Sequence, residues 1–506
     1  MDIRKLSRIF LLLPLLLSLM NLGPAQAAGP QLAADPTLVI WCPASVTLPK
    51  ARQEGCTRTY ATIADLWDYL SGHQPAIAGR IWIGRTYTET LNLWFDGGLL
   101  TKMAKYPLAF QGGWLGEGKG LDLKTPTVFH GVYFHIVNWR STVGVRNIKI
   151  EAVTPVLGIT RALNVQTLGS IKLDRVQAVG NDTDGAGLEN GGSVTVTNSK
   201  FDYNLYSGLG IITHGAVTLK AVRARVNGGQ GVHIEYALGD FTASPVTVTN
   251  GIFEGNIGGD GLNILANGPI TLTGVSAIRN AGHGTIVNNT PGAGSVALKL
   301  TNTFVGNGGY GLSLASNGSV LAEHLVAHQN KGGDGVAIDN TFALTPKAVT
   351  ITGSGKFYGN LYSGLNIQSD GAITTNQLTA SDNLGNGISL NTTLLTTSPA
   401  VTIKGNNIVS GNAFDGLKVI SVSSVILNRV IADSNARVGI NVGSDNTATL
   451  TCSSASGNFT GLFVRSADGV SALPLLVLRG FFAYENTLAD ENIILPDTQV
   501  VRTDCL

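Results

Sequence analysis

The side chains best suited to acid–base chemistry lie near the middle of the sequence. Glu235, Asp260 and His283 are 25 and 23 residues apart, which is close to the period of a repeat described below. Two carboxyl groups can protonate a leaving oxygen and activate water in glycoside hydrolysis, and histidine exchanges protons near neutral pH. If these three residues act together, they indicate a polysaccharide lyase or glycoside hydrolase that acts on a uronic-acid-containing polymer.

A second set of residues suits sugar binding rather than catalysis. Hydroxyl and amide groups donate and accept hydrogen bonds, as sugar hydroxyls also do. The binding candidates are His233, Asn263, Asn288, Tyr310, Asp334 and Asp339. Aromatic rings that could stack on sugars are sparse, and the candidates are Tyr206, Tyr236, Tyr310, Phe342 and Tyr362.

All these residues belong to a unit that recurs from about residue 180 onward. Each copy has an Asn, a few residues, a Gly, and then a variable residue between two apolar ones, as in Asn204-Leu-Tyr-Ser-Gly208-Leu-Gly-Ile211. Twelve anchor glycines, from Gly185 to Gly461, span 276 residues in 11 steps, so the mean period is about 25. Such repetition is typical of a solenoid, in which each coil is covered by its neighbours.

The apolar spacing within each unit predicts strands. The third residue after the anchor glycine is aliphatic in all 12 copies, and a second alternating segment follows, such as Val217-Thr-Leu219. Alternation with a period of two is typical of strands with one buried face, whereas a helix would need spacings of three and four. We therefore predict an all-β fold, a right-handed single-stranded parallel β-helix with coils ~4.8 Å apart.

The Asn and the Gly of each unit have separate expected roles. Asn tolerates a left-handed backbone at a bend, and Asn side chains stacked in register can hydrogen-bond along a ladder. Gly then permits a tight entry into the next strand. Both residues therefore favour closely stacked coils.

The repeat resembles the right-handed parallel β-helix of the pectin-lyase-like group. Ile81-Trp-Ile83 with Leu91-Asn-Leu93 is similar to the first coil of such proteins, and Tyr106-Pro107-Leu108 with Gln111-Gly112-Gly113 to the second. The resemblance covers roughly residues 60 to 490. It implies the fold rather than one activity, because this fold carries many activities.

Enzymes of this group place their catalytic residues on the outward positions of one sheet. In this sequence the outward positions would be one residue before the anchor glycine and two and four residues after it. Glu189 precedes Glu235 by two coils, so their side chains would be ~9–10 Å apart if both point outward. This separation is near the upper limit for the two carboxylates of an inverting glycosidase. However, any long solenoid also needs polar residues at its outward positions, because these positions face the solvent.

The motifs expected of the group's enzymes are incomplete. Gly282-His283-Gly284 resembles a polygalacturonase motif. However, the Asp-Asp, Asn-Thr-Asp and Arg-Ile-Lys sequences that are also expected in those enzymes do not occur here. Asp-Pro-His, as in alginate epimerases, is also absent. We find no calcium-binding acidic cluster with an arginine, as in pectate lyases, and no paired histidines at zinc spacing. We therefore predict no metal and no cofactor.

The two ends of the chain carry different signals. Arg4, Lys5 and Arg8, an apolar run over residues 9–22 and Ala25-Gln-Ala27 predict a cleaved signal peptide at residues 1–27. Thr62 and Asp65 form a capping-box pattern before a short helix that ends near Gly72. We expect an N-terminal cap at residues 28–80, the β-helix at 81–451, and the last coils with a C-terminal cap at 452–506.

The four cysteines indicate disulfides in an exported protein. Cys42, Cys56, Cys452 and Cys505 allow three pairings. About 16 coils form a rod of ~75 Å, and a disulfide needs Cα atoms within ~7 Å. We therefore favour Cys42 with Cys56 and Cys452 with Cys505.

Composition excludes some partners and leaves three functions open. The net charge is +1 without a basic cluster, so nucleic acid is excluded, and no apolar stretch after the signal peptide reaches membrane length. We expect a secreted, extracellular or periplasmic protein. Its polar face would bind a polysaccharide or a cell-surface component; the alternatives are the enzyme described above and an adhesin-like structural spacer.

Overall fold

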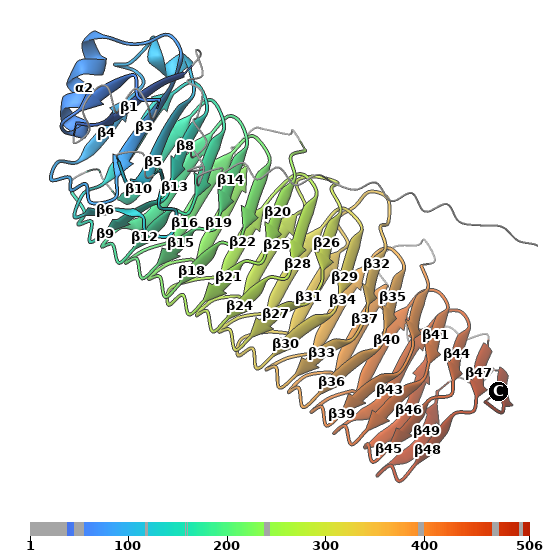
Figure 1. Ribbon diagram of the computed structural model, residues 1–506. Coiled ribbons are helices and arrows are strands. Elements are labelled where there is room, and N and C mark those ends of the chain that lie inside the picture. The colour runs from blue at the N-terminus through green and yellow to red at the C-terminus, as the bar shows by residue number, and fades with distance from the viewer. Residues whose placement is uncertain are drawn as a thin grey trace, which may run out of the picture.

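The computed structural model describes residues 38–44, 55–116, 120–156, 158, 160–236, 243–392, 399–467, 475–494 and 499–505. The expected signal peptide at residues 1–27 lies outside these residues. The chain winds into a long rod of stacked coils, which runs from the N-terminal cap to the C-terminal end without a break (Figure 1). The predicted all-β parallel β-helix is confirmed.

Three parallel sheets run along the rod, and a typical coil contributes one strand to each sheet. The sequence predicted two strands per coil; the third is a short strand of three or four residues, such as β18 (Arg223–Arg225). The sheet that carries the candidate site has 16 strands. They are β4 (Leu93–Asp96), β7 (Phe134–Trp139), β10 (Arg161–Thr167), β13 (Asp184–Asn190), β16 (Leu209–Thr213), β19 (Val232–Tyr236), β22 (Leu262–Leu265), β25 (Thr285–Asn289), β28 (Leu312–Ser316), β31 (Val336–Asn340), β34 (Leu365–Ser369), β37 (Ile388–Thr392), β40 (Leu417–Ser421), β43 (Val438–Ser444), β46 (Thr460–Arg465) and β49 (Ala489–Ile493).

The other two sheets form the remaining sides of the rod. The sheet of 19 strands contains β1 (Leu38–Pro43), β2 (Arg58–Tyr60), β3 (Ala78–Gly84), β5 (Leu108–Trp114), β8 (Val143–Arg146), β11 (Ile171–Asp174), β14 (Val194–Thr197), β17 (Val217–Lys220), β20 (Val246–Thr249), β23 (Ile270–Thr273), β26 (Val296–Lys299), β29 (Val320–Glu323), β32 (Val349–Thr352), β35 (Ile373–Asn376), β38 (Val401–Lys404), β41 (Val425–Asn428), β44 (Ala448–Thr451), β47 (Leu475–Arg479) and β50 (Gln499–Thr503). The sheet of 15 strands contains β6 (Thr127–His130), β9 (Ile148–Glu151), β12 (Gln177–Val179), β15 (Lys200–Asp202), β18, β21 (Ile252–Glu254), β24 (Ser276–Ile278), β27 (Asn302–Val305), β30 (Leu325–His328), β33 (Gly355–Tyr358), β36 (Leu378–Ser381), β39 (Asn407–Ser410), β42 (Val430–Asp433), β45 (Ser454–Ser456) and β48 (Phe482–Tyr484).

The aliphatic residues of the repeat line the interior of the rod, as predicted. The third residue after each anchor glycine is at most 2% exposed in all 12 copies. Equivalent residues of neighbouring coils pair directly, for example Ile211 with Ile234. Each buried aliphatic side chain contributes about 1.5–3 kcal/mol relative to an exposed one. The core of the coils is therefore one continuous column, and a small second cluster surrounds the Cys42–Cys56 disulfide at the N-terminal end.

The predicted asparagine ladder is present. Each Asn side chain donates from Nδ2 to the Oδ1 of the Asn in the next coil, at 2.8 Å from Asn181 to Asn204 and 2.9 Å from Asn360 to Asn383. The expected left-handed conformation of these Asn residues is wrong, because it belongs to the residue before each of them, such as Tyr203 with φ of 57°. The bend is made one residue earlier, which leaves the Asn free to face the neighbouring coil.

The anchor glycines are required by close approach rather than by a positive φ. A Cβ atom on Gly364 would lie 2.7 Å from the carbonyl oxygen of Gly387 and 2.9 Å from Nδ2 of Asn383. Real Cβ atoms do not approach backbone atoms this closely. The glycine of one coil therefore makes room for the asparagine ladder of the next, which explains why the two residues recur together.

Helix α2 (Ile63–Gly72) covers the N-terminal end of the rod, as Figure 1 shows. Both hydrogen bonds of the predicted capping box are present between Thr62 and Asp65. Ile63, Leu66 and Leu70 are buried against the first coils. The helix thus closes the apolar interior that the first coil would otherwise expose.

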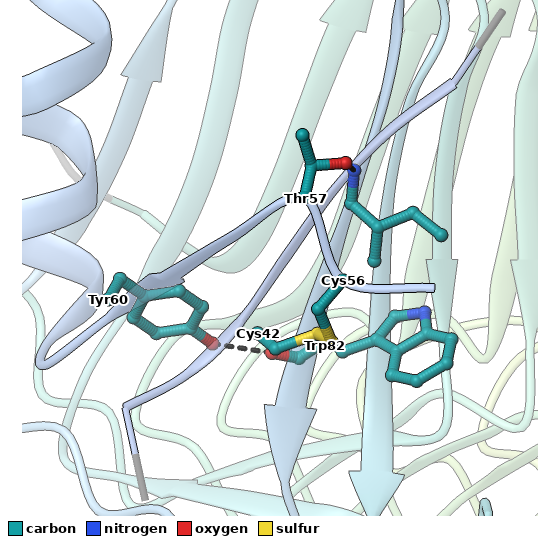
Figure 2. The surroundings of a disulfide bond; sticks show 6 residues. Cys42, Cys56, Thr57, Tyr60 and Trp82 are labelled. Atoms are coloured by element: carbon teal, nitrogen blue, oxygen red, sulfur yellow. Dashed lines mark hydrogen bonds between the residues drawn. A yellow bond between two sulfur atoms is a disulfide. The ribbon is translucent and has the colours of Figure 1, made fainter. Parts of the chain in front are cut away.

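Both disulfides follow the favoured local pairing. The Cα atoms are 5.9 Å apart in Cys42–Cys56 and 5.5 Å apart in Cys452–Cys505. In Figure 2 the first disulfide lies beside Trp82, whose carbonyl oxygen accepts a hydrogen bond from the Tyr60 hydroxyl at 2.5 Å. Disulfides are typical of an oxidising compartment such as the periplasm or the extracellular space.

The helices were also searched for membrane spans. Within the described ranges, no helix is both long enough and apolar enough to cross a bilayer.

Candidate functional site

The outward face of the 16-stranded sheet carries the candidate residues. In β34 the residues one and three after the anchor glycine are buried, whereas Asn366 and Gln368, two and four residues after it, reach the surface. Neighbouring coils continue these positions in register, so that Asn366 pairs with Ala337 on one side and Ser389 on the other. Two of the three expected outward columns are therefore confirmed.

In the third expected column, one residue before the anchor glycine, His283 and Tyr310 are partly exposed as expected, but three aspartates differ from the prediction. Asp260 and Asp334 are only 8% and 6% exposed, and Asp415 is 3% exposed. Oδ1 of Asp260 accepts a hydrogen bond from the backbone N–H of His283 at 2.8 Å, and Oδ1 of Asp334 accepts one from Ser363 at 2.7 Å. These three carboxylates are buried and accept hydrogen bonds from backbone donors of the next coil.

The same column brings Asp260, His283 and Tyr310 together. Nδ1 of His283 accepts a hydrogen bond from the backbone N–H of Tyr310 at 3.0 Å. The two rings stack with centroids 5.3 Å apart. With Nδ1 used as an acceptor, the neutral imidazole carries its proton on Nε2.

Glu235 lies at the other end of its strand from this column. Its Oε2 is 3.3 Å from Nε2 of His233, two residues earlier on β19. Glu235 and Asp260 are five positions apart along the strand direction, which corresponds to ~16 Å at ~3.3 Å per residue. The structure therefore joins Glu235 to His233 and joins Asp260 to His283, but it does not bring the two pairs together.

The remaining binding candidates are spread over the face. Asn263 donates from Nδ2 to Oδ2 of Asp260 at 3.2 Å. Oδ1 of Asn288 accepts from the Thr290 hydroxyl, and Oδ1 of Asp339 accepts from the Thr341 hydroxyl, at 2.8 and 2.7 Å. These side chains brace the loops that follow their strands.

The aromatic candidates fall into different surroundings. Tyr236 is buried and donates its hydroxyl hydrogen to the Ser244 carbonyl at 2.6 Å, so it offers no stacking surface. Tyr206, Phe342 and Tyr362 are exposed. Tyr362 lies in a groove with Tyr310 and Asp334.

We call this hollow the aromatic groove; it has a volume of about 440 Å³. The residues that line it are Tyr310, Asp334, Leu361, Tyr362, Ser363, Asn366, Leu384, Gly385, Asn386 and Phe414. The sequence analysis singled out Tyr310, Asp334 and Tyr362 but missed Phe414 and Leu384. Their position, one or two residues after the ladder Asn, was the available signal, because Leu361 and Tyr362 occupy the same two positions.

Burial perturbs the ionisable groups of the aromatic groove. It raises the pKa of Asp334, although hydrogen bonds from Asn366 and Ser363 act in the opposite direction. Burial also raises the pKa of Tyr310, and the nearby Asp334 carboxylate adds to this shift. The groove therefore disfavours additional negative charge.

A second hollow lies nearer the N-terminal end of the same face, and we call it the charged depression. Gly187 and Gly210 stand in the outward column where other coils have side chains, and the Arg161 side chain lies over Gly187. Arg161 contacts Oε1 of Glu189 at 2.6 Å, and Gln166 donates to Oε2 of Glu189 at 2.8 Å.

A groove of about 660 Å³ extends from Glu189 past Ile212 to Arg140 and His214. Ile212 also separates Glu189 from Glu235 in the outward column. The two carboxylates were singled out from the sequence, but the groove beside Glu189 was not.

Among the residues that the structure describes, no three His, Cys, Asp or Glu side chains are grouped to hold a metal ion.

Comparison with known proteins gives one family and three solved structures. A family model described as "Right handed beta helix region" matches residues 184–354 and 293–455, which together cover more than half of the chain. No curated protein matches the sequence.

The similar structures are all distant. The A-module of the mannuronan C-5 epimerase AlgE4 of Azotobacter vinelandii is 13% identical, with a TM-score of 0.35, and the match covers 72% of this chain and 91% of that one. The catalytic domain of a GH87 α-1,3-glucanase in complex with nigerose is 12% identical, with a TM-score of 0.30, and the match covers 94% and 70%. The A-module of the epimerase AlgE6 of A. vinelandii is 11% identical, with a TM-score of 0.22, and the match covers 88% and 94%. At these values the similarities carry no weight for function.

Proposed function

The chain belongs to the right-handed β-helix family, and we propose that it binds a glycan along the outward face of its 16-stranded sheet. The observation that supports this proposal is the aromatic groove, which combines exposed rings with amide and hydroxyl groups. Aromatic faces pack against the C–H faces of sugars, while amides donate to and accept from sugar hydroxyls. This combination is typical of ligand sites that orient a partly apolar ligand with a few polar groups.

The groove can hold an extended ligand. Tyr310, Asp334, Tyr362, Asn386 and Phe414 belong to five successive coils. Four steps between coils correspond to ~19 Å along the rod. A linear oligosaccharide lying along the rod would therefore contact several coils at once, and its binding energy would be shared among them.

The test uses the full, disulfide-bonded protein on an array of oligosaccharides, followed by calorimetry on the best ligand. Replacing Tyr362→Ala should weaken binding by about tenfold, or ~1.4 kcal/mol, because a stacked ring is lost. Tyr206→Ala is the matched control, since Tyr206 lies in the same five-residue motif and is equally exposed at 54% against 56%. No binding to any glycan would refute the proposal and favour the structural spacer.

Glycoside hydrolysis is a second candidate, and the charged depression favours it. Glu189 and Glu235 stand in one outward column two coils apart, or ~9.6 Å, close to the spacing of an inverting pair. The candidate set Glu235, Asp260 and His283, acting on a uronic-acid-containing polymer, also remains a proposal, although Asp260 lies ~16 Å along the strand from Glu235.

Activity can be tested separately from binding. The protein would be incubated with neutral and uronic-acid polymers, and new reducing ends and unsaturated products would be measured. Loss of turnover in Glu189→Gln and Glu235→Gln, but not in Asp260→Asn, would identify the depression as the catalytic centre. Turnover that depends on Asp260 and His283 would identify the other set, and no turnover with any polymer would exclude both.

We also propose that the signal peptide at residues 1–27 directs the chain out of the cytoplasm, where its partner would be a polysaccharide or a cell-surface component. The division into a cap at 28–80, the β-helix at 81–451 and the last coils at 452–506 belongs to this proposal. Detection of the cleaved protein in a cell-free culture fluid or a periplasmic fraction would test it.

A further inference from the structure

We infer that the aromatic groove selects neutral glycans and discriminates against both uronate-bearing and amino-sugar polymers. The inference rests on the proposed function and adds the class of ligand that the groove accepts. It is carried by the charges that line the groove and by the hydrogen bonds that those charges already make.

Among the described residues that line the groove, the only charged side chain is the carboxylate of Asp334. A uronate carboxylate in the groove would meet this like charge without a lining cation to compensate it. Asp415, one coil beyond Asn386, adds a second buried carboxylate to this side of the face. Bringing another anion into such surroundings is unfavourable because desolvation and repulsion both oppose it.

Three cations lie near the groove and do not line it. Lys331, three residues before Asp334, lies beside Leu361 and Leu384 in a neighbouring hollow. The Arg437 guanidinium lies 5.6 Å from the centroid of the Phe414 ring. Lys418 is two coils beyond Asn366 in the outward column, or ~9.6 Å away. None of these three cations is among the described residues that line the groove.

The Asp334 carboxylate is equally unsuited to an ammonium group. Its Oδ1 accepts from the backbone N–H of Ser363 at 2.7 Å, and its Oδ2 accepts from Nδ2 of Asn366 at 3.1 Å. These bonds hold the carboxylate against the backbone, and the side chain is 6% exposed. An amino sugar would lose its hydration in the groove without gaining a freely oriented counter-ion.

Neutral hydroxyl groups, in contrast, find suitable partners. Oδ1 of Asn386 accepts from the backbone N–H of Asp415 at 3.1 Å, which fixes the amide and leaves its two N–H donors available. The Tyr310 ring is stacked on His283 of the preceding coil and packs against Gly333 of the next, so it is held in place. A fixed amide and a supported ring cost little entropy on binding because they are already oriented.

The experiment compares three sets of short oligosaccharides by calorimetry with the full, disulfide-bonded protein. The first set is neutral and contains gluco-, xylo- and manno-oligosaccharides. The second contains oligogalacturonate and oligomannuronate, and the third contains chitosan oligomers. We expect a neutral ligand to bind at least tenfold more tightly than any member of the other sets, and Tyr362→Ala to weaken that binding about tenfold.

The Asp334→Asn variant tests the cause of the selectivity. The chain itself has Asn386 at the equivalent position two coils later. There the amide oxygen accepts a hydrogen bond from a backbone N–H of the next coil, as Oδ1 of Asp334 does, so an Asn is compatible with this position. We expect this variant to gain affinity for oligogalacturonate relative to the neutral ligand by about fivefold or more. Thermal unfolding of each variant would show that it has the same fold as the wild type.

The outcomes separate the two proposals. A uronate or chitosan oligomer that binds most tightly, and loses affinity in Tyr362→Ala, overturns the selectivity and leaves the glycan-binding function standing. Binding of a neutral glycan that is insensitive to Tyr362→Ala shows that the groove is not the site. If no member of the three sets binds, the proposed function itself fails.

Discussion

Two stretches of the chain have the same five residues, Asn-Leu-Tyr-Ser-Gly, at Asn204–Gly208 and Asn360–Gly364. Locally they are alike: each Asn is buried in the ladder, each Tyr is exposed, and each Ser donates its backbone N–H to an aspartate of the preceding coil. Their neighbours differ, and the second copy, but not the first, lines the aromatic groove.

The difference comes from the following coils. Gly228 and Gly229 lie against Leu205 and Tyr206 in the first copy. After the second copy, Leu384 occupies the position of Gly228, and Phe414 follows one coil later. The same motif is therefore a flat corner in one place and the wall of a groove in the other, because side chains of neighbouring coils define the hollow.

The largest expected effect concerns the asparagine ladder, which the two copies share. Asn360→Ala would remove the acceptor of the Asn330 side chain and the donor to Asn383, and Asn204→Ala would do the same to Asn181 and Asn227.

Each unsatisfied buried group costs about 1–3 kcal/mol, so each variant should lose about 3 kcal/mol or more of unfolding free energy. Urea unfolding followed by circular dichroism measures this loss. Clearly unequal losses would mean that the ladder differs between the two copies.

The next effect concerns the aromatic groove, which distinguishes the second copy from the first. Phe414→Ala removes one wall of the aromatic groove and should weaken glycan binding about fivefold, or ~1 kcal/mol. Phe459 is a suitable control because it is similarly exposed at a corner of the rod but does not line the groove. Calorimetry on both variants measures the difference, and equal losses would argue against a localised site.

A smaller effect should follow from making the first copy more like the second. Gly210 stands where the second copy has Asn366, and a Cβ atom there would meet no atom within 4 Å. Because glycine in a strand is destabilising by about 0.5–1 kcal/mol, Gly210→Asn should raise stability by about that amount.

The contrasting variant is Gly364→Asn, whose Cβ would lie 2.7 Å from the Gly387 carbonyl oxygen, and it should fold poorly or not at all. Thermal and urea unfolding of both variants would decide this. A destabilised Gly210→Asn protein would show that the charged depression must remain open for the fold itself.

The smallest expected effect is a shared dependence on pH. Burial raises the pKa of both Asp184 and Asp334 above the ordinary value of 3.8, against the opposing effect of their hydrogen bonds to Ser207 and Ser363. An acid with a raised pKa in the folded state binds its proton more tightly there than in the unfolded chain. The resulting stabilisation is complete below the unfolded pKa of about 3.9 and is lost as the pH rises through the folded value.

This dependence can be isolated by subtraction. The unfolding free energy of the wild type should fall relative to that of Asp334→Asn as the pH rises through this window, and Asp184→Asn should behave in the same way. Urea unfolding at a series of pH values measures the difference. The opposite slope would mean that the hydrogen bonds outweigh burial at these sites.

Sequence reasoning predicted the architecture well because its signals are local and repeated. Ile211, Ile234 and their equivalents alternate with polar residues on every coil, and Asn204 returns in each coil as its equivalents do. The cysteines could be paired because the length of the rod forbids every bridge between its ends. The candidate site was harder, since Asp260 and Asp334 are polar residues at a corner, and polarity alone suggested that they face the solvent.

The sequence by itself therefore determined a solenoid, its period, its interior and its ladder, because each depends on residues two positions apart or one coil apart. Only the tertiary structure decided that Asp334 is held by the next coil, that Glu235 is remote from Asp260, and that Tyr310, Tyr362 and Phe414 enclose one hollow. The physical reason is that burial and convergence depend on hydrogen bonds and side-chain volumes contributed by several coils together, and no single copy of the repeat contains that information.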